Sequence, residues 1–193
     1  MKKWPLLIIV IITITSCKQK TKEEEKNFIS IISLIKQQVQ RVDTSLYAIV
    51  RTSYTDTSHI DTTYIPREDF EKVAADFLDI PDLSAPKIAK RYRQEPARYD
   101  EDLKRVIITY IPLKPEEEEI KLQEMLVLPD AGTGDKVTNI RIVRDIDNRD
   151  SLLHKEMLWR MDESFQVITT SQKPGKPEVT TITKVSWNEG SYQ

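Results

Sequence analysis

The sequence predicts an α+β fold in which N-terminal helices pack on one face of a five- or six-stranded, mainly antiparallel sheet. Two segments before residue 80 carry apolar residues at the spacing of a helix that buries one side. After about residue 104, β-rich segments alternate with short polar turns, which join antiparallel neighbours. Helices followed by a β-meander are typical of the α+β class. We therefore expect one domain over residues 27–193, with a helical part at about 27–100 and a meander at about 104–188.

The first predicted helix runs from about Glu23 to Val39. The three glutamates at its start favour the positive end of a helix dipole. Its apolar residues share one stripe: Phe28, Ile31, Ile32, Ile35 and Val39. We expect this stripe to pack on the sheet of the same chain; the alternative is that it binds a partner helix.

A β-hairpin is predicted between residues 44 and 65. Leu46–Val50 and Thr62–Ile65 are rich in β-branched and aromatic residues, which favour strands. The polar residues 56–59 between them are typical of a turn.

A second helix is predicted from Pro66, which suits the first helical position because it has no N–H to leave unpaired. Its stripe consists of Phe70, Val73, Ala74, Phe77 and Leu78. Pro81 and Pro86 end this helix, and residues 86–94 are expected to form a further short helix. That stretch is the most basic of the chain, but acidic residues follow it directly, so we expect the charges to neutralise one another.

Six strands are predicted in the second half: Arg105–Ile111, Glu119–Leu128, Val137–Ile146, Leu152–Met161, Phe165–Ser171 and Val179–Trp187. Alternation of apolar and polar residues indicates a sheet with one covered and one wet face. In the second strand, Ile120, Leu122, Leu126 and Leu128 are expected to share a face, and in the third Ile140, Ile142 and Ile146. Trp159 alternates with two methionines and is expected in the core.

Residues 1–17 carry the pattern of an export signal. Two lysines precede an apolar run that is shorter than the roughly 20 residues needed to span a bilayer. The run ends in Ile14-Thr15-Ser16-Cys17, an aliphatic residue, two small residues and a cysteine. These four residues resemble the lipobox of bacterial lipoproteins. The resemblance implies cleavage before Cys17 and acylation of Cys17, the lipid attachment site.

The anchor implies a domain order and a location. Residues 1–16 are expected to be a cleaved signal peptide, and 17–26 a lipidated, charged tether. Two or more acyl chains hold a protein firmly to a membrane. We expect the protein in the cell envelope, on the outer membrane, with the periplasmic face favoured over the cell surface. Glu23 to Glu25 resemble a surface-export signal, but they lie further from Cys17 than is usual.

The composition excludes several function classes. A formal net charge of −2 does not favour a nucleic-acid partner, which requires a basic face. The two histidines, His59 and His154, do not have the spacing of a zinc site. Residues 145–150 resemble a calcium loop, but Arg149 occupies a ligand position and no glycine follows, so a hairpin turn is the better interpretation. We therefore predict no catalytic, metal or cofactor residues.

Two functional hypotheses remain. The first is a non-enzymatic envelope lipoprotein, a binding or accessory module in which the wet face of the sheet, or the edge of the helical layer, engages a protein partner or a small ligand. The second is a hydrolase of envelope glycans or peptides that uses a pair of carboxylates about 5–10 Å apart. A sequence this rich in acidic residues does not identify such a pair, so whether the chain is an enzyme stays open, with a non-enzyme favoured.

Overall fold

A computed structural model describes residues 28–42, 44, 47–55, 59–132, 134–148 and 150–188. The helices are α1 (Ile31–Val42), α2 (Phe70–Val73), α3 (Ala75–Leu78) and α4 (Pro86–Ala89), with 3₁₀ turns η1 (Arg67–Asp69) and η2 (Pro115–Glu117). The strands are β1 (Ile49–Tyr54), β2 (Ile60–Ile65), β3 (Tyr92–Gln94), β4 (Arg98–Asp100), β5 (Arg105–Pro112), β6 (Ile120–Leu128), β7 (Lys136–Asn148), β8 (Ser151–Arg160), β9 (Ser164–Gln172) and β10 (Val179–Ser186).

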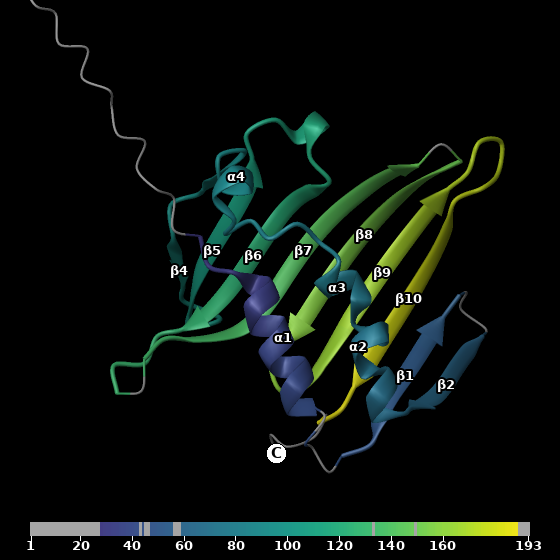
Figure 1. Cartoon of the computed structure of the whole chain (residues 1–193), viewed down its shortest axis with the longest axis horizontal. Helices are drawn as coiled ribbons and strands as arrows, with labels where there is room; N and C mark the ends of the chain where they lie inside the picture. Colours follow the sequence, from purple (N-terminus) through teal and green to yellow (C-terminus); the bar gives the residue numbers. More distant parts are fainter. Residues whose placement is uncertain are drawn as a thin grey trace, which may run out of the picture.

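One antiparallel sheet of ten strands organises the structure (Figure 1). Its order is β2-β1-β10-β9-β8-β7-β6-β5-β3, with β4 also paired to β5. The strands β5 to β10 follow one another as a meander. The hairpin β1–β2 adds to the last strand of that meander, and the short strands β3 and β4 add to the first.

The predicted fold class is therefore wrong. The sheet has ten strands instead of five or six: the predicted hairpin β1–β2 belongs to it, and so do β3 and β4, which were not predicted as strands. Within the described residues, α-helix is limited to α1, of 12 residues, and to three helices of four residues each. The pairing of the hairpin with the meander was missed because it joins residues far apart in sequence. Val50 on β1 pairs with Ser186 on β10, and the local periodicity of a sequence carries no information on such a pair. Residues 86–94, predicted as one short helix, divide into α4 and β3.

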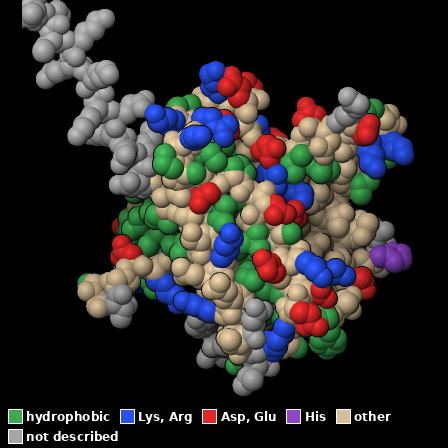
Figure 2. Space-filling model, viewed as in Figure 1, with side chains coloured by type: hydrophobic (Ala, Val, Ile, Leu, Met, Phe, Trp, Pro, Cys, Tyr) green, Lys and Arg blue, Asp and Glu red, His purple; other side chains and the backbone are tan. Residues whose placement is uncertain are grey.

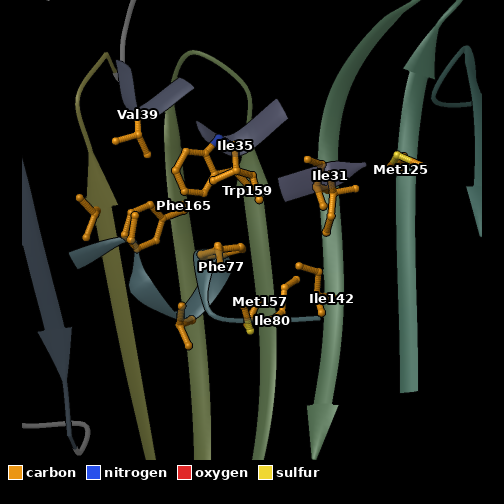
Figure 3. Close-up of a cluster of buried hydrophobic side chains, with 14 of the residues drawn as sticks. Ile31, Ile35, Val39, Phe77, Ile80, Met125, Ile142, Met157, Trp159 and Phe165 are labelled. Carbon is orange, nitrogen blue, oxygen red and sulfur yellow. The ribbon is translucent and has the colours of Figure 1, made fainter. Parts of the chain in front are cut away.

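The main core lies between the helices and the face of the sheet that they cover, which we call the inner face. From α1, Ile31, Ile35, Val39 and Val42 are buried at helical spacing. From α2 and α3, Phe70 and Phe77 reach an aromatic cluster on the sheet. Figure 3 shows Phe77 between the two layers, close to Trp159 and Phe165. The ring centroids of Phe77 lie 5.1 Å from Trp159 and 5.3 Å from Phe165.

Both predicted helices differ from expectation at their ends. Residues 28–30 precede α1 instead of belonging to it, because the Ser30 hydroxyl accepts from the Ser33 N–H at 3.2 Å and caps the helix. Phe28 stacks on Tyr110 with centroids 4.3 Å apart. The second helix is interrupted at Ala74, although its predicted stripe is correct in that Phe70, Ala74 and Phe77 are fully buried.

The β1–β2 hairpin and the six later strands are confirmed. So are the buried positions of Ile140, Ile142 and Trp159. The predicted face of β6 is wrong, because Gln123, Met125 and Val127 are buried there instead of Leu122, Leu126 and Leu128. The ladder with β7 has a register irregularity between Ile120 and Leu122, which reverses the alternation after Ile120.

Candidate binding face of the sheet

The face of the sheet opposite the helices, which we call the outer face, is the candidate functional surface. On the helix side, acidic and basic side chains intermingle over the visible surface, and neither charge gathers in one region (Figure 2). The outer face is different, because the cross-strand register arranges its side chains in rows of distinct chemistry. Residues directly opposite each other in an antiparallel ladder share a face, so the rows follow from the pairing.

The central row of the outer face is apolar along most of its length. It crosses seven adjacent strands from β6 to β2 and consists of Leu122, Val143, Glu156, Ile168, Ile182, Tyr54 and Ile60. We call it the apolar row. Its members are half-buried or exposed, whereas Gln123, Ile142, Met157 and Val167, their inner-face neighbours on β6 to β9, are buried. Six strand spacings of about 4.8 Å give it a length of about 29 Å.

Polar residues flank the apolar row on both sides. One side carries Asp145, His154, Thr170 and Thr180, which we call the histidine row. The other side is more mixed and carries Glu124, Arg141, Leu158, Gln166, Lys184, Thr52 and Thr62. Glu156 interrupts the apolar row and pairs with Arg141 at 3.5 Å. An apolar centre with a polar rim of both charge signs is the anatomy of a protein–protein interface.

His154 lies between two carboxylates. Its Nδ1 is 2.7 Å from Asp145 Oδ1, and its Nε2 is 3.8 Å from Glu156 Oε1. Lys121 Nζ lies 4.0 Å from the other oxygen of Asp145. All three members of the Asp145–His154–Glu156 group are partly exposed on the open sheet. The arrangement orients an imidazole between two acids, which is a general acid–base geometry.

A small hollow opens at the end of α1. Its volume is about 120 Å³, and its lining includes Gln38, Arg41, Tyr47, Asp162 and Trp187. Asp162 has a left-handed backbone with φ 60°, which is strained for a non-glycine residue. The buried Gln38 side chain holds it: Gln38 Nε2 donates to Asp162 Oδ1 at 3.0 Å, and Asp162 N–H donates to Gln38 Oε1 at 2.7 Å. Through these two hydrogen bonds, Gln38 connects α1 to the β8–β9 turn.

A second, more open hollow lies between two hairpin tips. Its volume is about 360 Å³, and it is lined by residues of the β7–β8 and β9–β10 connections, among them Leu152, Lys173 and Lys176. Most of its lining residues are exposed, so it encloses a ligand poorly.

A buried carboxylate joins β3 to the start of β6. Glu118 is only 7% exposed, and it accepts from Arg91 Nη1 at 2.8 Å and from the Tyr92 hydroxyl at 3.1 Å. Burial, followed by the negative charge of Glu118, raises the pKa of the Tyr92 hydroxyl well above its usual value. Because the Glu118 carboxylate and the Tyr92 hydroxyl are both largely buried, we infer that this hydrogen-bonded cluster stabilises the fold.

The residues singled out from the sequence are dispersed in the structure. His59 is exposed beside β2, and His154 is on the outer face, which corresponds to the predicted wet face of the sheet. The predicted hairpin turn near residues 145–150 is confirmed by the pairing of Asn148 with Ser151. Trp187 is buried, like Trp159. No group of three or more His, Cys, Asp or Glu side chains in the described part of the chain could hold a metal ion.

The predicted anchor lies outside the described residues. This holds for the signal peptide 1–16, for Cys17 and for the tether 17–26. Among the residues that the structure does describe, no helix has the length and hydropathy needed to cross a bilayer.

Comparisons with protein-family models, with curated proteins and with solved structures gave no significant match.

Proposed function

We propose that this chain is a lipid-anchored protein of the bacterial cell envelope, and that its folded domain is a non-enzymatic binding module. Support for the anchor comes from the resemblance of residues 14–17 to a lipobox and from Cys17 being the only cysteine in the chain. Several acyl chains on Cys17 would hold the domain at the membrane. The outer membrane, on its periplasmic side, is the proposed location.

The observation that carries the binding proposal is the apolar row. Six of its seven members, on adjacent strands from β6 to β2, are apolar and half-buried or exposed; Glu156 is the exception, and polar rows of both charge signs flank the row. The proposed occupant is an amphipathic segment of an envelope protein that lies across the strands. A helix of about 19 residues has the length of the row at 1.5 Å per residue. Its apolar stripe would contact Val143, Ile168 and Ile182, and its polar flanks the two neighbouring rows.

Crosslinking in cells tests this proposal. The acylated protein is crosslinked in the envelope, and its partners are identified by mass spectrometry. The test variant combines Ile168→Lys with Ile182→Lys, at the centre of the apolar row. The matched control combines Thr170→Lys with Thr180→Lys, which places the same charges on the same two strands and the same face, one row away.

We expect one reproducible partner that the isoleucine variant loses and the threonine control retains, because rim contacts contribute little to affinity compared with the centre of an interface. The thermal unfolding midpoint of both variants is measured to confirm that they fold. Absence of a reproducible partner, or retention of the partner by the folded isoleucine variant, would overturn the proposal.

The alternative function is hydrolysis of envelope glycans or peptides by two acids. The observation that favours it is the contact of His154 with both Asp145 and Glu156. Purified protein is incubated with envelope glycans and peptides, and products are detected by mass spectrometry. Hydrolysis that is lost in both Asp145→Asn and Glu156→Gln would replace the non-enzymatic proposal with this one.

A further inference from the structure

The two edges of the sheet differ in how they are protected. At one edge, β3 and β4 have three residues each and carry Arg93, Arg98 and Asp100. Short, charged edge strands are a common protection against pairing with other chains. The other edge is β2, which has six residues, pairs with β1 in an unbroken register, contains no lysine, arginine or proline, and carries one charged residue, Asp61. Among the residues that the structure describes, no strand pairs with the outer edge of β2, so one row of its backbone N–H and C=O groups has no strand partner.

The side chains of β2 are also unusually exposed. Ile60 is 63% exposed and Tyr64 is 75% exposed, which are the two highest values among the described large hydrophobic side chains. Both point to the outer face, where Ile60 ends the apolar row. Figure 1 places β2 at the margin of the sheet, beyond β1. The free edge and the exposed side chains therefore coincide.

We propose that β2 pairs antiparallel with β2 of a second copy of this chain and joins the two sheets into one. The register is centred on Thr62, which faces Thr62 of the second copy. In this register Ile60 lies opposite Tyr64 of the second copy, and Asp61 lies opposite Thr63. The two-fold axis repeats each of these pairs, so the contact is self-complementary.

The side chains favour this register over its neighbours. Aromatic–β-branched and threonine–threonine pairs are favourable cross-strand pairs, and here they occur together. A shift of two residues in one direction places Asp61 opposite Asp61, which opposes like charges. A shift of two in the other direction places Ile60 opposite Pro66, which has no N–H to donate. A shift of one residue joins the outer face of one copy to the inner face of the other.

A second copy of this chain is the favoured partner of the β2 edge, because β2 itself supplies both residues of each favourable cross-strand pair. The paired edge covers Ile60 and Tyr64, and the apolar row of one copy continues onto Tyr64 of the other. This dimer does not rest on the proposed anchor or on the proposed envelope partner, because neither contributes a contact to β2.

A cysteine at the two-fold axis tests the register. The full chain carrying Thr62→Cys is expressed in cells, treated with a mild oxidant, and examined on a non-reducing gel. Side chains of directly opposed residues lie about 4.5–5.5 Å apart at Cβ, close enough for a disulfide after a small adjustment. Wild type controls for Cys17, the one native cysteine. Thr180→Cys on β10 is the matched control for an exposed strand thiol away from the edge.

The expected result is a covalent dimer in the Thr62→Cys protein that is absent from wild type and from Thr180→Cys. Equal dimer in Thr62→Cys and Thr180→Cys, or no dimer in either, would overturn the proposal. A lack of dimer would not be caused by misfolding of the variant, because Thr62 is exposed and its replacement leaves the core intact.

Charge complementation gives an independent test. Two copies with different affinity tags are co-expressed, and one is purified to detect the other. Thr62→Lys in both copies, or Thr62→Glu in both, opposes like charges at the axis, and co-purification should fall to background. One copy with Thr62→Lys and the other with Thr62→Glu should restore it. Co-purification that is unchanged by the like-charged pairs, or not restored by the opposite pair, would refute pairing through β2.

Discussion

Phe77 is the residue through which the short helices are fixed to the sheet. It is 0% exposed, and its ring packs edge-on against Trp159 at an interplanar angle of 81° and against Phe165 at 62°. It belongs to α3, a helix of four residues, which is too short to be stable alone. The position of α3 on the sheet therefore depends on this side chain.

The expected cost of Phe77→Ala is about 3–5 kcal/mol, the usual range for a buried phenylalanine reduced to alanine. Part of it is the loss of two edge-on ring contacts of about 0.5–1.5 kcal/mol each. Phe77→Leu keeps most of the volume but also loses both ring contacts, so it should cost about 1–3 kcal/mol, less than Phe77→Ala. Phe77→Asp should unfold the domain, because it adds an unpaired buried charge to a total stability of about 5–15 kcal/mol.

Urea unfolding followed by tryptophan fluorescence measures these costs on residues 27–193. The two tryptophans of this segment, Trp159 and Trp187, lie 5.4 Å apart in the same cluster, so the signal reports on the perturbed site. The matched control is Leu113→Ala, at a leucine that is 52% exposed, which should change stability by less than about 0.5 kcal/mol. A cost below about 1 kcal/mol for Phe77→Ala would refute the packing argument.

Three further outcomes are expected. Cys17→Ala should leave unprocessed precursor without acyl chains, and mass spectrometry that still finds acylation would contradict the lipobox. Gln38→Ala, which leaves the Asp162 N–H without its acceptor, should lower stability by about 1–3 kcal/mol in urea titrations. Burial raises the pKa of Tyr92 and Tyr110 above the usual 10, so stability should be complete below about pH 10 and fall as the pH rises above it, by at most about 1.4 kcal/mol per pH unit for each tyrosine; urea midpoints that stay constant from pH 9 to 11 would contradict this.

The meander was predictable because its signals are local. Alternation within each strand and polar residues between strands are properties of neighbouring residues, and they identified β5 to β10. The other four strands were harder to place: β3 and β4 were not predicted, and the hairpin β1–β2 was predicted without its position in the sheet. β3 and β4 have only three residues each, fewer than a period-two pattern needs to stand out. The position of the β1–β2 hairpin beside β10 depends on contacts between the two ends of the domain.

The apolar row was not predictable from any one strand. Val143, Ile168 and Ile182 each appear in sequence as an apolar residue on the wet side of an alternating pattern, which is common and uninformative. Only the register of the whole sheet places them side by side. The β6 bulge had a similar effect, because one irregularity near Ile120 moved Leu122 from the expected inner face into the row. The anchor at Cys17, by contrast, was predicted from four consecutive residues.

The two proposed contacts use different parts of the outer face and can therefore be separated by mutation. Charges at Thr62 remove the dimer and leave Ile168 and Ile182 unchanged, whereas lysines at Ile168 and Ile182 remove the partner surface and leave β2 unchanged. In the dimer, the two apolar rows lie on one continuous face, so a partner that spans both copies would bind more weakly to a Thr62→Lys monomer. If the joined sheet is the binding surface, the Thr62→Lys protein should capture less partner, and mixing Thr62→Lys copies with Thr62→Glu copies should restore the capture. If the Thr62→Lys protein captures as much partner as the mixture does, the partner binds a single copy.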